Sequence, residues 1–151
     1  RGNMEHRQYN PEFKSMCLDL FDSNLGVFFD ASERQEFSDY LDSLNKDSSY
    51  FIGIHDGLVV SCGGLSESSD KAGLTWGMVR KNHHGSGFGT KLTDFRLSKI
   101  RENGQINVVL IETSQHTQGF YLKRGFTQTK VVKNGFGKGI DRVSMELNIT
   151  R

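Results

Sequence analysis

The sequence predicts one domain of the α/β class, with a central mixed, mostly antiparallel sheet of about seven strands flanked by about four helices. Three observations predict this fold. Segments with helical spacing of apolar residues separate short strand-type runs along the whole chain. Two such runs meet at Asp56-Gly57, which is a strong hairpin signal. The last run, residues 142–149, alternates between apolar and polar side chains, as a strand with one buried face does.

The length and composition fit a single globular domain over residues 1–151. A chain of 151 residues can bury about two thirds of its unfolded surface without disulfides or metals. The formal net charge is +1, and the sequence shows no clustered basic stripe of the kind that binds nucleic acid. No apolar run approaches the ~20 residues of a membrane span. No signal peptide is recognisable, so we expect a cytoplasmic protein in which Arg1-Gly2-Asn3 is a cloning remnant.

The first part of the chain contains a strand and two helices. Residues 4–9 form a candidate edge strand. A helix then begins with Asn10 as its cap and Pro11 at its first position. A second helix is expected from about Ser32, where Ser32 and Gln35 have the spacing of a capping box.

The middle of the chain is predicted to be a run of antiparallel strands. Residues 50–55 and 57–62 are the two strands of the Asp56-Gly57 hairpin. Residues 66–71 are polar and are expected to be a loop. Residues 74–80 form the next strand, in which Gly77 favours a bulge.

The second half continues the alternation of elements. Residues 106–111 are almost continuously apolar, which predicts a central strand buried on both faces. A short helix from about Thr117 is expected to end at Gly125 in a left-handed cap. The glycine-rich residues 134–139 are followed by a strand, so we expect a flexible hairpin loop after the strand at 126–132.

A glycine-rich turn leads from residues 74–80 into a helix that runs to about Arg101. Gly85, Gly87 and Gly89 let the backbone approach a diphosphate closely, and the first N–H groups of the helix point to the same place. An ATP-type loop would need Gly-Lys-Ser/Thr, and Gly89-Thr90-Lys91 has the wrong order. A dinucleotide fingerprint needs one more spacer residue and an acidic residue further on.

The loop resembles a third phosphate-binding pattern. His84-Gly85-Ser86-Gly87-Phe88-Gly89 is similar to the acetyl-CoA loop of the GNAT N-acetyltransferase superfamily, Gln/Arg-x-x-Gly-x-Gly/Ala, with His84 in first position. About thirty residues on, residues 120–126 resemble the Tyr-x-x-x-Gly-Phe signature of the same family. The resemblance covers nearly the whole chain and implies a small, bacterial-type, single-domain member with the GNAT fold.

The resemblance implies that acetyl-CoA binds to the loop, the preceding strand and one residue further on. The residues expected to contact it are Met78, Val79, Arg80, His84, Gly85, Ser86, Gly87, Phe88, Gly89, Thr90 and Ser114. Three features depart from the family pattern: His84 replaces Gln or Arg, Ser114 stands where many members have asparagine, and residues 74–80 contain no glutamate.

The implied activity is transfer of an acetyl group from acetyl-CoA to a primary amine, directly, in a ternary complex. Backbone N–H groups near Met78 or Val79 would polarise the carbonyl, and Tyr121 would protonate the sulfur of CoA. The alternative for Tyr121 is a packed aromatic ring. Glu112 is the first candidate for the base and His116 the second. A solvated carboxylate and a helix-capping histidine are the respective alternatives.

The resemblance places the acceptor, a small-molecule or peptide amine, beside the first helices. Phe28, Phe29 and Trp76 are expected to line its pocket, with Glu33 and Phe136 as further candidates. Ordinary packing is the alternative for the aromatic residues. A homodimer is compatible with the family and is left open by the sequence.

Two other interpretations stay open, and two kinds of site are not expected. The chain could be an acyl-CoA-binding module without turnover, or a structural domain without CoA affinity. Cys17 and Cys62 fall on a predicted helix face and strand, which favours reduced thiols. The adjacent His83 and His84 lack accompanying carboxylates or cysteines, so no metal site is expected.

Overall fold

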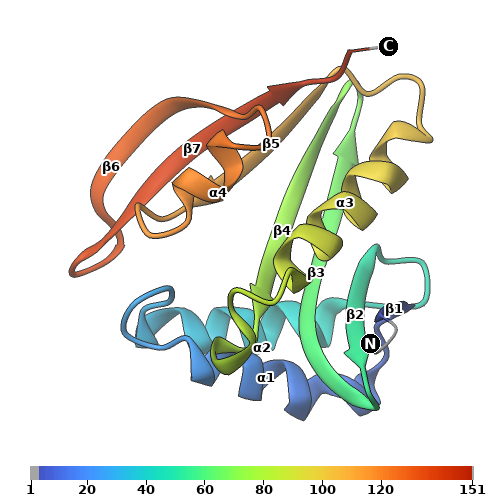
Figure 1. Cartoon of the computed structure of the whole chain (residues 1–151), viewed down its shortest axis with the longest axis vertical. Coiled ribbons are helices and arrows are strands. Elements are labelled where there is room, and N and C mark those ends of the chain that lie inside the picture. Colours follow the sequence, from blue (N-terminus) through green and yellow to red (C-terminus); the bar gives the residue numbers. More distant parts are fainter. Residues whose placement is uncertain (1–3, 151) are drawn as a thin grey trace.

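The computed structural model describes residues 4–150, so the proposed cloning remnant at residues 1–3 lies outside the described chain. Within this range, seven strands and four α-helices form the predicted α/β fold with its mixed sheet (Figure 1). In chain order the elements are β1 Met4–Gln8, α1 Lys14–Ser23, α2 Arg34–Ser43, β2 Tyr50–His55, β3 Leu58–Ser68, β4 Lys71–Val79, α3 Phe88–Arg101, β5 Val108–Thr113, α4 Gln118–Leu122, β6 Thr127–Gly137 and β7 Ile140–Asn148.

The sheet opens between its fourth and fifth strands. Its order is β1-β2-β3-β4-β5-β7-β6, and β4 with β5 pair in parallel while the other neighbours described are antiparallel. β4 and β5 are paired only over Lys71–Gly73 and Val108–Leu110. Beyond these residues the two strands run apart, so the sheet has the shape of a V (Figure 1). The opening of the V positions the candidate site.

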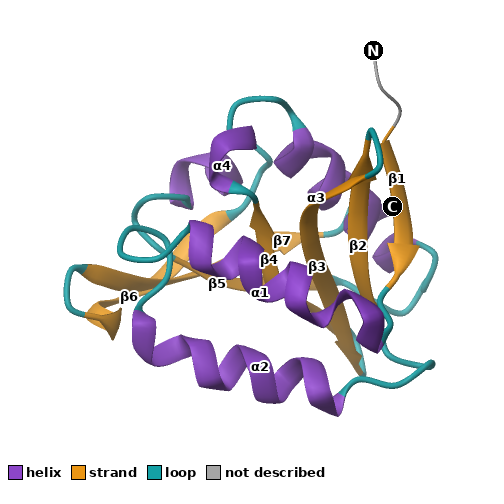
Figure 2. Cartoon of the chain, turned by 90° about the horizontal axis from the view of Figure 1, so that it is seen from below, coloured by secondary structure: helices purple, strands orange, loops and turns teal. Residues whose placement is uncertain are grey.

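Helices cover both faces of the sheet (Figure 2). α1 and α2 pack on one face in a cluster of buried side chains that includes Phe21 and Phe37. α3 and α4 pack on the other face in a cluster that includes Leu97 and Tyr121. Both cysteines are buried and free, as expected.

The β4 strand contains the predicted bulge. The pairing with β3 moves from Cys62 to Gly64 on one strand and from Met78 to Thr75 on the other, so β4 has one extra residue. Trp76 takes a φ of +42° there. A positive φ is a genuine outlier for a bulky residue.

The helix caps agree with the sequence for the first helix and differ for the second. Asn10 accepts a hydrogen bond from the backbone N–H of Glu12, with Pro11 at the helix start. The capping box of the second helix is formed by Asp30 and Glu33, not by Ser32 and Gln35. Asp30 reaches the first free N–H groups two residues earlier, so the helical turn begins at Ala31.

Two predicted loops are mostly strand. Residues 66–71 belong to the β3–β4 hairpin, in which Ser68 pairs with Lys71. Residues 134–139 belong to the β6–β7 hairpin, in which Gly137 pairs with Ile140. Both hairpin ends are largely exposed, so their outward polar residues are compatible with strand pairing and do not indicate a loop.

The strand predicted at residues 106–111 lies two residues later and is not buried on both faces. β5 spans Val108–Thr113, and Leu110 is 40% exposed. Leu110 still pairs with Gly73 but lines the cleft, and beyond it β5 no longer pairs with β4 and continues along the cleft.

Candidate active site

A cleft of about 1390 Å³ lies in the opening between β4 and β5. Its lining comes from α2, β4, the glycine-rich turn, α3, β5, α4 and the β6–β7 hairpin. Residues far apart in the sequence, such as Phe29, Gly87 and Tyr121, therefore border one space. A cleft of this kind, with apolar walls and a few polar groups, is the usual form of a ligand site.

The backbone of β4 presents one donor to this cleft. The N–H of Arg80 donates to the carbonyl of Val60 at 2.8 Å. Backbone groups on an antiparallel strand alternate in direction, so Met78 also bonds toward β3 and Val79 points away from it, toward the opening. The carbonyl of Val79 accepts from the side chain of Asn24 at 2.9 Å. The N–H of Val79 is therefore the backbone group aimed at the opening.

This geometry corrects part of the expected acetyl-CoA contacts. The N–H and C=O of Arg80 are both used within the chain, since its carbonyl accepts from His83 at 2.8 Å. Its guanidinium donates to the carbonyl of Val59 at 3.2 Å. Arg80 is not among the cleft-lining residues, and Met78 lines the cleft with its side chain.

The glycine-rich turn has the conformation that a phosphate site requires. Gly85 and Gly87 both have φ of +85°, and a Cβ at either position would have no neighbour within 4 Å. α3 begins directly after Gly87, and no side chain caps it. Its first N–H groups and the positive end of its dipole are therefore available to an anion.

Three loop residues are placed differently from their neighbours. Ser86 is exposed and does not line the cleft. Phe88 is 6% exposed, with its ring 4.8 Å from that of His55, so it can offer only its backbone. The ring of His84 is turned back, with Nε2 at 2.9 Å from the carbonyl oxygen of Val79. His84 therefore links the loop to β4, whereas the resemblance implied a contact to phosphate.

Thr90 and Arg124 meet at the start of α3. The guanidinium of Arg124 donates to the hydroxyl of Thr90 and lies 3.8 Å from the centroid of the Phe120 ring. Arg124 brings a positive charge to the expected phosphate site. It lies within the Tyr-x-x-x-Gly-Phe segment, which is the signal that could have identified it.

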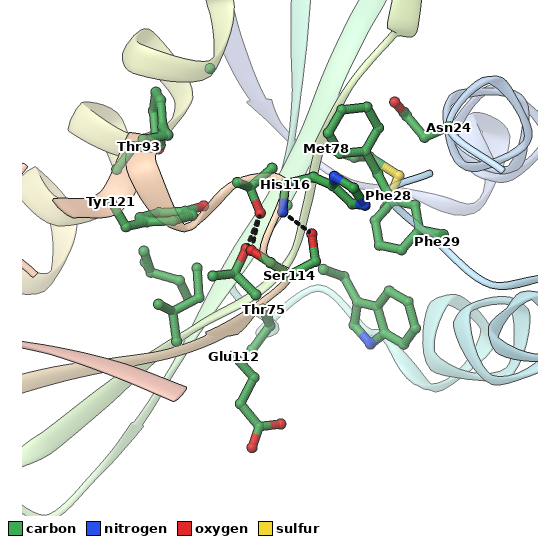
Figure 3. Close-up of a pocket in the computed structure, with 18 of the residues that line it drawn as sticks. Asn24, Phe28, Phe29, Thr75, Met78, Thr93, Glu112, Ser114, His116 and Tyr121 are labelled. Atoms are coloured by element: carbon green, nitrogen blue, oxygen red, sulfur yellow. Dashed lines mark hydrogen bonds between the residues drawn. The ribbon is translucent and has the colours of Figure 1, made fainter. Parts of the chain in front are cut away.

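Tyr121 lies on the opposite wall of the cleft. Its ring packs against Phe120 and Phe126, with centroids 5.0 and 5.4 Å away. Only 9% of the residue is exposed. Its hydroxyl points from the α4 wall into the space in front of Met78 and His116 (Figure 3).

Ser114 and His116 form the turn that leads into α4. The Oγ of buried Ser114 accepts from the N–H of His116 at 3.1 Å (Figure 3). The carbonyl of Ser114 accepts from Gln118 at 2.9 Å. Ser114 therefore stabilises the start of the helix. The imidazole of His116 is exposed and lies 6.0 Å from the Phe28 ring.

Glu112 borders the cleft but does not face the other candidates. It pairs with Ser144 in the β5–β7 ladder and is exposed. Figure 3 shows its carboxylate directed away from Tyr121 and His116. His116 is therefore better placed than Glu112 to reach an amine beside Val79.

Aromatic residues form the wall on the α1–α2 side. Phe28, Phe29 and Trp76 all line the cleft, and Phe28 makes an edge contact with His84 at 5.1 Å. Phe29 also stacks on Phe21 at 4.8 Å, so it has a packing role as well.

Glu33 and Phe136 both line the cleft, and the hairpin that carries Phe136 lies against Asp30 near Glu33. Burial raises the pKa of the Glu33 carboxyl, although one oxygen accepts from the N–H of Asp30. The guanidinium of Arg142 lies 5.6 Å from the centroid of the Phe136 ring. This part of the cleft therefore carries both signs of charge.

Several polar residues of the lining were not found from the sequence, namely Asn24, Thr93, Arg96 and Arg142. A signal existed for Arg96. It stands between Leu92 and Ile100 at steps of four residues, a position on the apolar face of α3 where a charged residue is unusual.

The sheet is mixed and opens between the parallel strands β4 and β5, and the glycine-rich turn at the start of α3 borders this opening. Comparisons with known proteins give the family. The model of the acetyltransferase (GNAT) domain matches residues 18–149, so the chain belongs to the GNAT acetyltransferase family. A search of curated protein sequences gives no match.

Solved structures share the fold at low sequence identity. Ard1 from Thermoplasma volcanium is 20% identical, with a TM-score of 0.80 over 98% of this chain and 99% of that one. The ribosomal-protein-S18-alanine N-acetyltransferase from Escherichia coli is 14% identical, with a TM-score of 0.78 over 99% and 96%. An aminoglycoside 6'-N-acetyltransferase complexed with coenzyme A is 15% identical, with a TM-score of 0.73 over 99% and 98%.

No helix in residues 4–150 is both long and apolar enough to cross a membrane. In the same residues, no group of three or more His, Cys, Asp or Glu side chains is arranged to hold a metal ion.

Proposed function

We propose that the chain transfers an acetyl group from acetyl-CoA to a primary amine by direct transfer in a ternary complex. The observation that carries this proposal is the N–H of Val79, which follows the backbone bulge and points away from β3 toward the cleft that Tyr121 also lines. A fixed donor and an acidic hydroxyl on opposite sides of one space are what a thioester-cleaving transfer needs.

The glycine-rich turn fits the diphosphate of acetyl-CoA. The open space at Gly85 and Gly87 allows the backbone to approach closely, and the uncapped start of α3 supplies N–H groups. Gly89 and Thr90 also line the cleft, and the Arg124 guanidinium adds positive charge next to Thr90. When bound, acetyl-CoA supplies the activated acetyl group.

The residues of the cleft can perform the transfer as follows. The N–H of Val79 donates to the acetyl carbonyl oxygen as negative charge develops on it. The lone pair of the neutral amine forms the new C–N bond, and His116, directly or through water, takes the proton that the nitrogen loses as this bond forms. Tyr121 gives its hydroxyl proton to the sulfur as the C–S bond breaks.

The structure changes which residue we prefer as the general base. Glu112 has its carboxylate directed away from Tyr121. His116 has an exposed ring near Phe28, at the expected acceptor end of the cleft. We therefore propose His116 as the base and a lesser role for Glu112.

We propose that the acceptor amine enters along Phe28, Phe29 and Trp76, with Glu33 near its positive charge. An ammonium group is attracted both by aromatic faces and by a carboxylate. A small-molecule amine or a peptide N-terminus is compatible with this wall, and a homodimer remains compatible with the family.

The test is release of the CoA thiol, followed with a thiol reagent, across a panel of amino acids, polyamines, aminoglycosides and peptides. Amine-dependent release supports the transferase. Acetyl-CoA binding without release across the panel, together with no effect of Tyr121→Phe, would instead support the acyl-CoA-binding module. No affinity for acetyl-CoA would leave a structural domain.

A further inference from the structure

The bulge in β4 is held in a strained conformation by three separate elements. Trp76 has a φ of +42°, which side chains of its kind rarely adopt. Such strain persists only where the surroundings over-determine the backbone, and it concentrates at functional sites. The contacts around Trp76 therefore show which groups hold the backbone in this conformation.

Two tyrosines hold the bulge from the β2 and α2 side. The hydroxyl of Tyr50, which is fully buried, donates to the carbonyl of Trp76 at 2.8 Å. The hydroxyl of Tyr40 lies 3.2 Å from the Oγ1 of Thr75. The two residues before Gly77 are thus fixed through both a carbonyl and a side chain.

Arg96 holds the bulge from the α3 side. Its guanidinium lies so close to the strand that a Cβ on Gly77 would be 2.8 Å from Nη2, and one on Gly63 would be 3.2 Å from Cζ. Its Nη1 donates to the carbonyl of Gly64 at 3.2 Å. Glycines at 63 and 77 make the room that this side chain occupies.

Burial of the Arg96 side chain at this position costs folding free energy. The residue is 1% exposed, and its Nε is buried without a hydrogen-bond partner. None of the ion pairs found among residues 4–150 includes it. A buried cation without a paired carboxylate is destabilising, so a structural role alone is a poor explanation for it.

The charge of Arg96 reaches across the sheet. Burial lowers the pKa of His6, and the charge of Arg96 lowers it further. On the other face of the sheet, burial raises the pKa of Tyr40, and the charge of Arg96 opposes that rise. The glycines that surround the guanidinium leave no side chains between it and the strand. Its positive field therefore extends through β4 toward the cleft, which Arg96 itself lines.

We propose that Arg96 is a positioning residue for acetyl transfer. It fixes the bulge so that the N–H of Val79, two residues beyond Gly77, is held toward the acetyl carbonyl, and it places a fixed positive charge behind that point. Negative charge on the carbonyl oxygen is stabilised by dipoles and charges that are already in place. This proposal rests on the transferase function proposed above.

The experiment compares Arg96→Met and Arg96→Lys with Lys99→Met, a control that removes an exposed cation from the same helix. We measure kcat, the Kd of acetyl-CoA and the emission of Trp76, which is the only tryptophan of the chain and lies in the bulge itself. For Arg96→Met we expect kcat to fall about 100-fold, as for a small displacement of a reacting group, with the Kd changed by less than about threefold.

The two remaining variants separate charge from packing. Arg96→Lys should recover about tenfold of the lost kcat, since it restores the charge but not the planar group. Lys99→Met should retain wild-type kcat and Trp76 emission. A kcat of Arg96→Met within about threefold of wild type would overturn the proposal, as would an equal loss in Lys99→Met.

Gly77→Ala keeps the proposal testable if Arg96→Met folds poorly. The added methyl displaces the guanidinium, so Gly77→Ala should shift Trp76 emission and lower kcat, and unchanged values would overturn the proposal. If wild-type protein shows no turnover with any amine, the transferase function fails. Trp76 emission that is unaltered in both Arg96→Met and Gly77→Ala would show separately that Arg96 does not hold the bulge.

Discussion

The two strands that border the cleft differ in how firmly they are held. The β4 side is fixed by buried contacts, since Tyr50 donates to the carbonyl of Trp76, β3 pairs with the strand, and Arg96 packs against Gly77. On the β5 side, pairing with β4 ends at Leu110, and Glu112 and His116 beyond it have exposed side chains. Both strands line the same cleft, but they supply different kinds of group.

We therefore assign different roles in the proposed reaction to the two sides of the cleft. Chemistry common to any acceptor, such as polarising the acetyl carbonyl, is assigned to the backbone of β4. Choice of acceptor and removal of its proton are assigned to side chains that can change without disturbing the core. Substitutions on the two sides should therefore have different consequences, which the following predictions test in order of expected size.

The largest effect is expected for Tyr121→Phe, on the α4 wall. Loss of the proton donor should lower kcat by about 10²- to 10⁴-fold, the typical contribution of general acid catalysis. The ring contacts with Phe120 and Phe126 remain, so the Kd of acetyl-CoA should be unchanged. Tyr9→Phe removes a hydroxyl from a buried tyrosine that does not line the cleft, and it should match wild type. An unaltered kcat in Tyr121→Phe would remove the residue from the mechanism.

His116→Gln and Glu112→Gln test the β5 side. We expect His116→Gln to lower kcat by about 100-fold near neutral pH, the low end of what a general base contributes. Glu112→Gln should change kcat much less, because its carboxylate points away from Tyr121. Steady-state rates with one amine decide between them. The reverse order would restore Glu112 as the base and contradict our assignment.

Tyr50→Phe tests the β4 side through stability. It leaves the buried carbonyl of Trp76 without its donor, which should lower the free energy of unfolding by about 1–3 kcal/mol. Because the bulge loses one of its contacts, Trp76 emission should shift as well. Urea unfolding and fluorescence measure both quantities. A stability loss without any change in emission would show that the bulge does not depend on Tyr50.

The smallest effect concerns pH and His6. Burial, followed by the charges of Arg96 and Lys91, holds the pKa of His6 below its ordinary value of 6.5. Between the two pKa values the unfolded chain binds more protons than the folded one, so stability should fall as the pH drops below 6.5.

Replacing His6 isolates this term. His6→Phe keeps a ring against Phe95, whose centroid lies 4.6 Å from the imidazole. Unfolding free energies between pH 5 and 8 should therefore depend less on pH in His6→Phe than in wild type. Equal slopes in the two proteins would show that His6 is not the responsible group.

The sequence predicted the features that depend on local signals. Asp56 and Gly57 both take positive φ in a tight hairpin, and Gly125 takes a φ of +95° after α4, as their residue types indicate. The bulge next to Gly77 and the helix after the glycine-rich turn were predicted for the same reason.

Features that depend on long-range contacts were missed. Residues 106–111 are apolar enough for a buried strand, but the opening of the sheet exposes one side of β5, and local composition does not encode that opening. The use of both backbone groups of Arg80 depends on pairing with Val60 and on the following turn. Arg96 was overlooked because its partners are glycines on two other strands.

The most direct test of the central claim is a calorimetric titration with acetyl-CoA, run beside ATP and NAD, on wild type, Gly87→Glu and Gly104→Glu. Gly87→Glu puts a negative side chain into the proposed phosphate site, whereas Gly104→Glu adds the same charge at a glycine outside the cleft lining. We expect micromolar binding of acetyl-CoA but not of ATP or NAD, lost in Gly87→Glu and kept in Gly104→Glu. No binding by wild type, or equal binding by both variants, would contradict it.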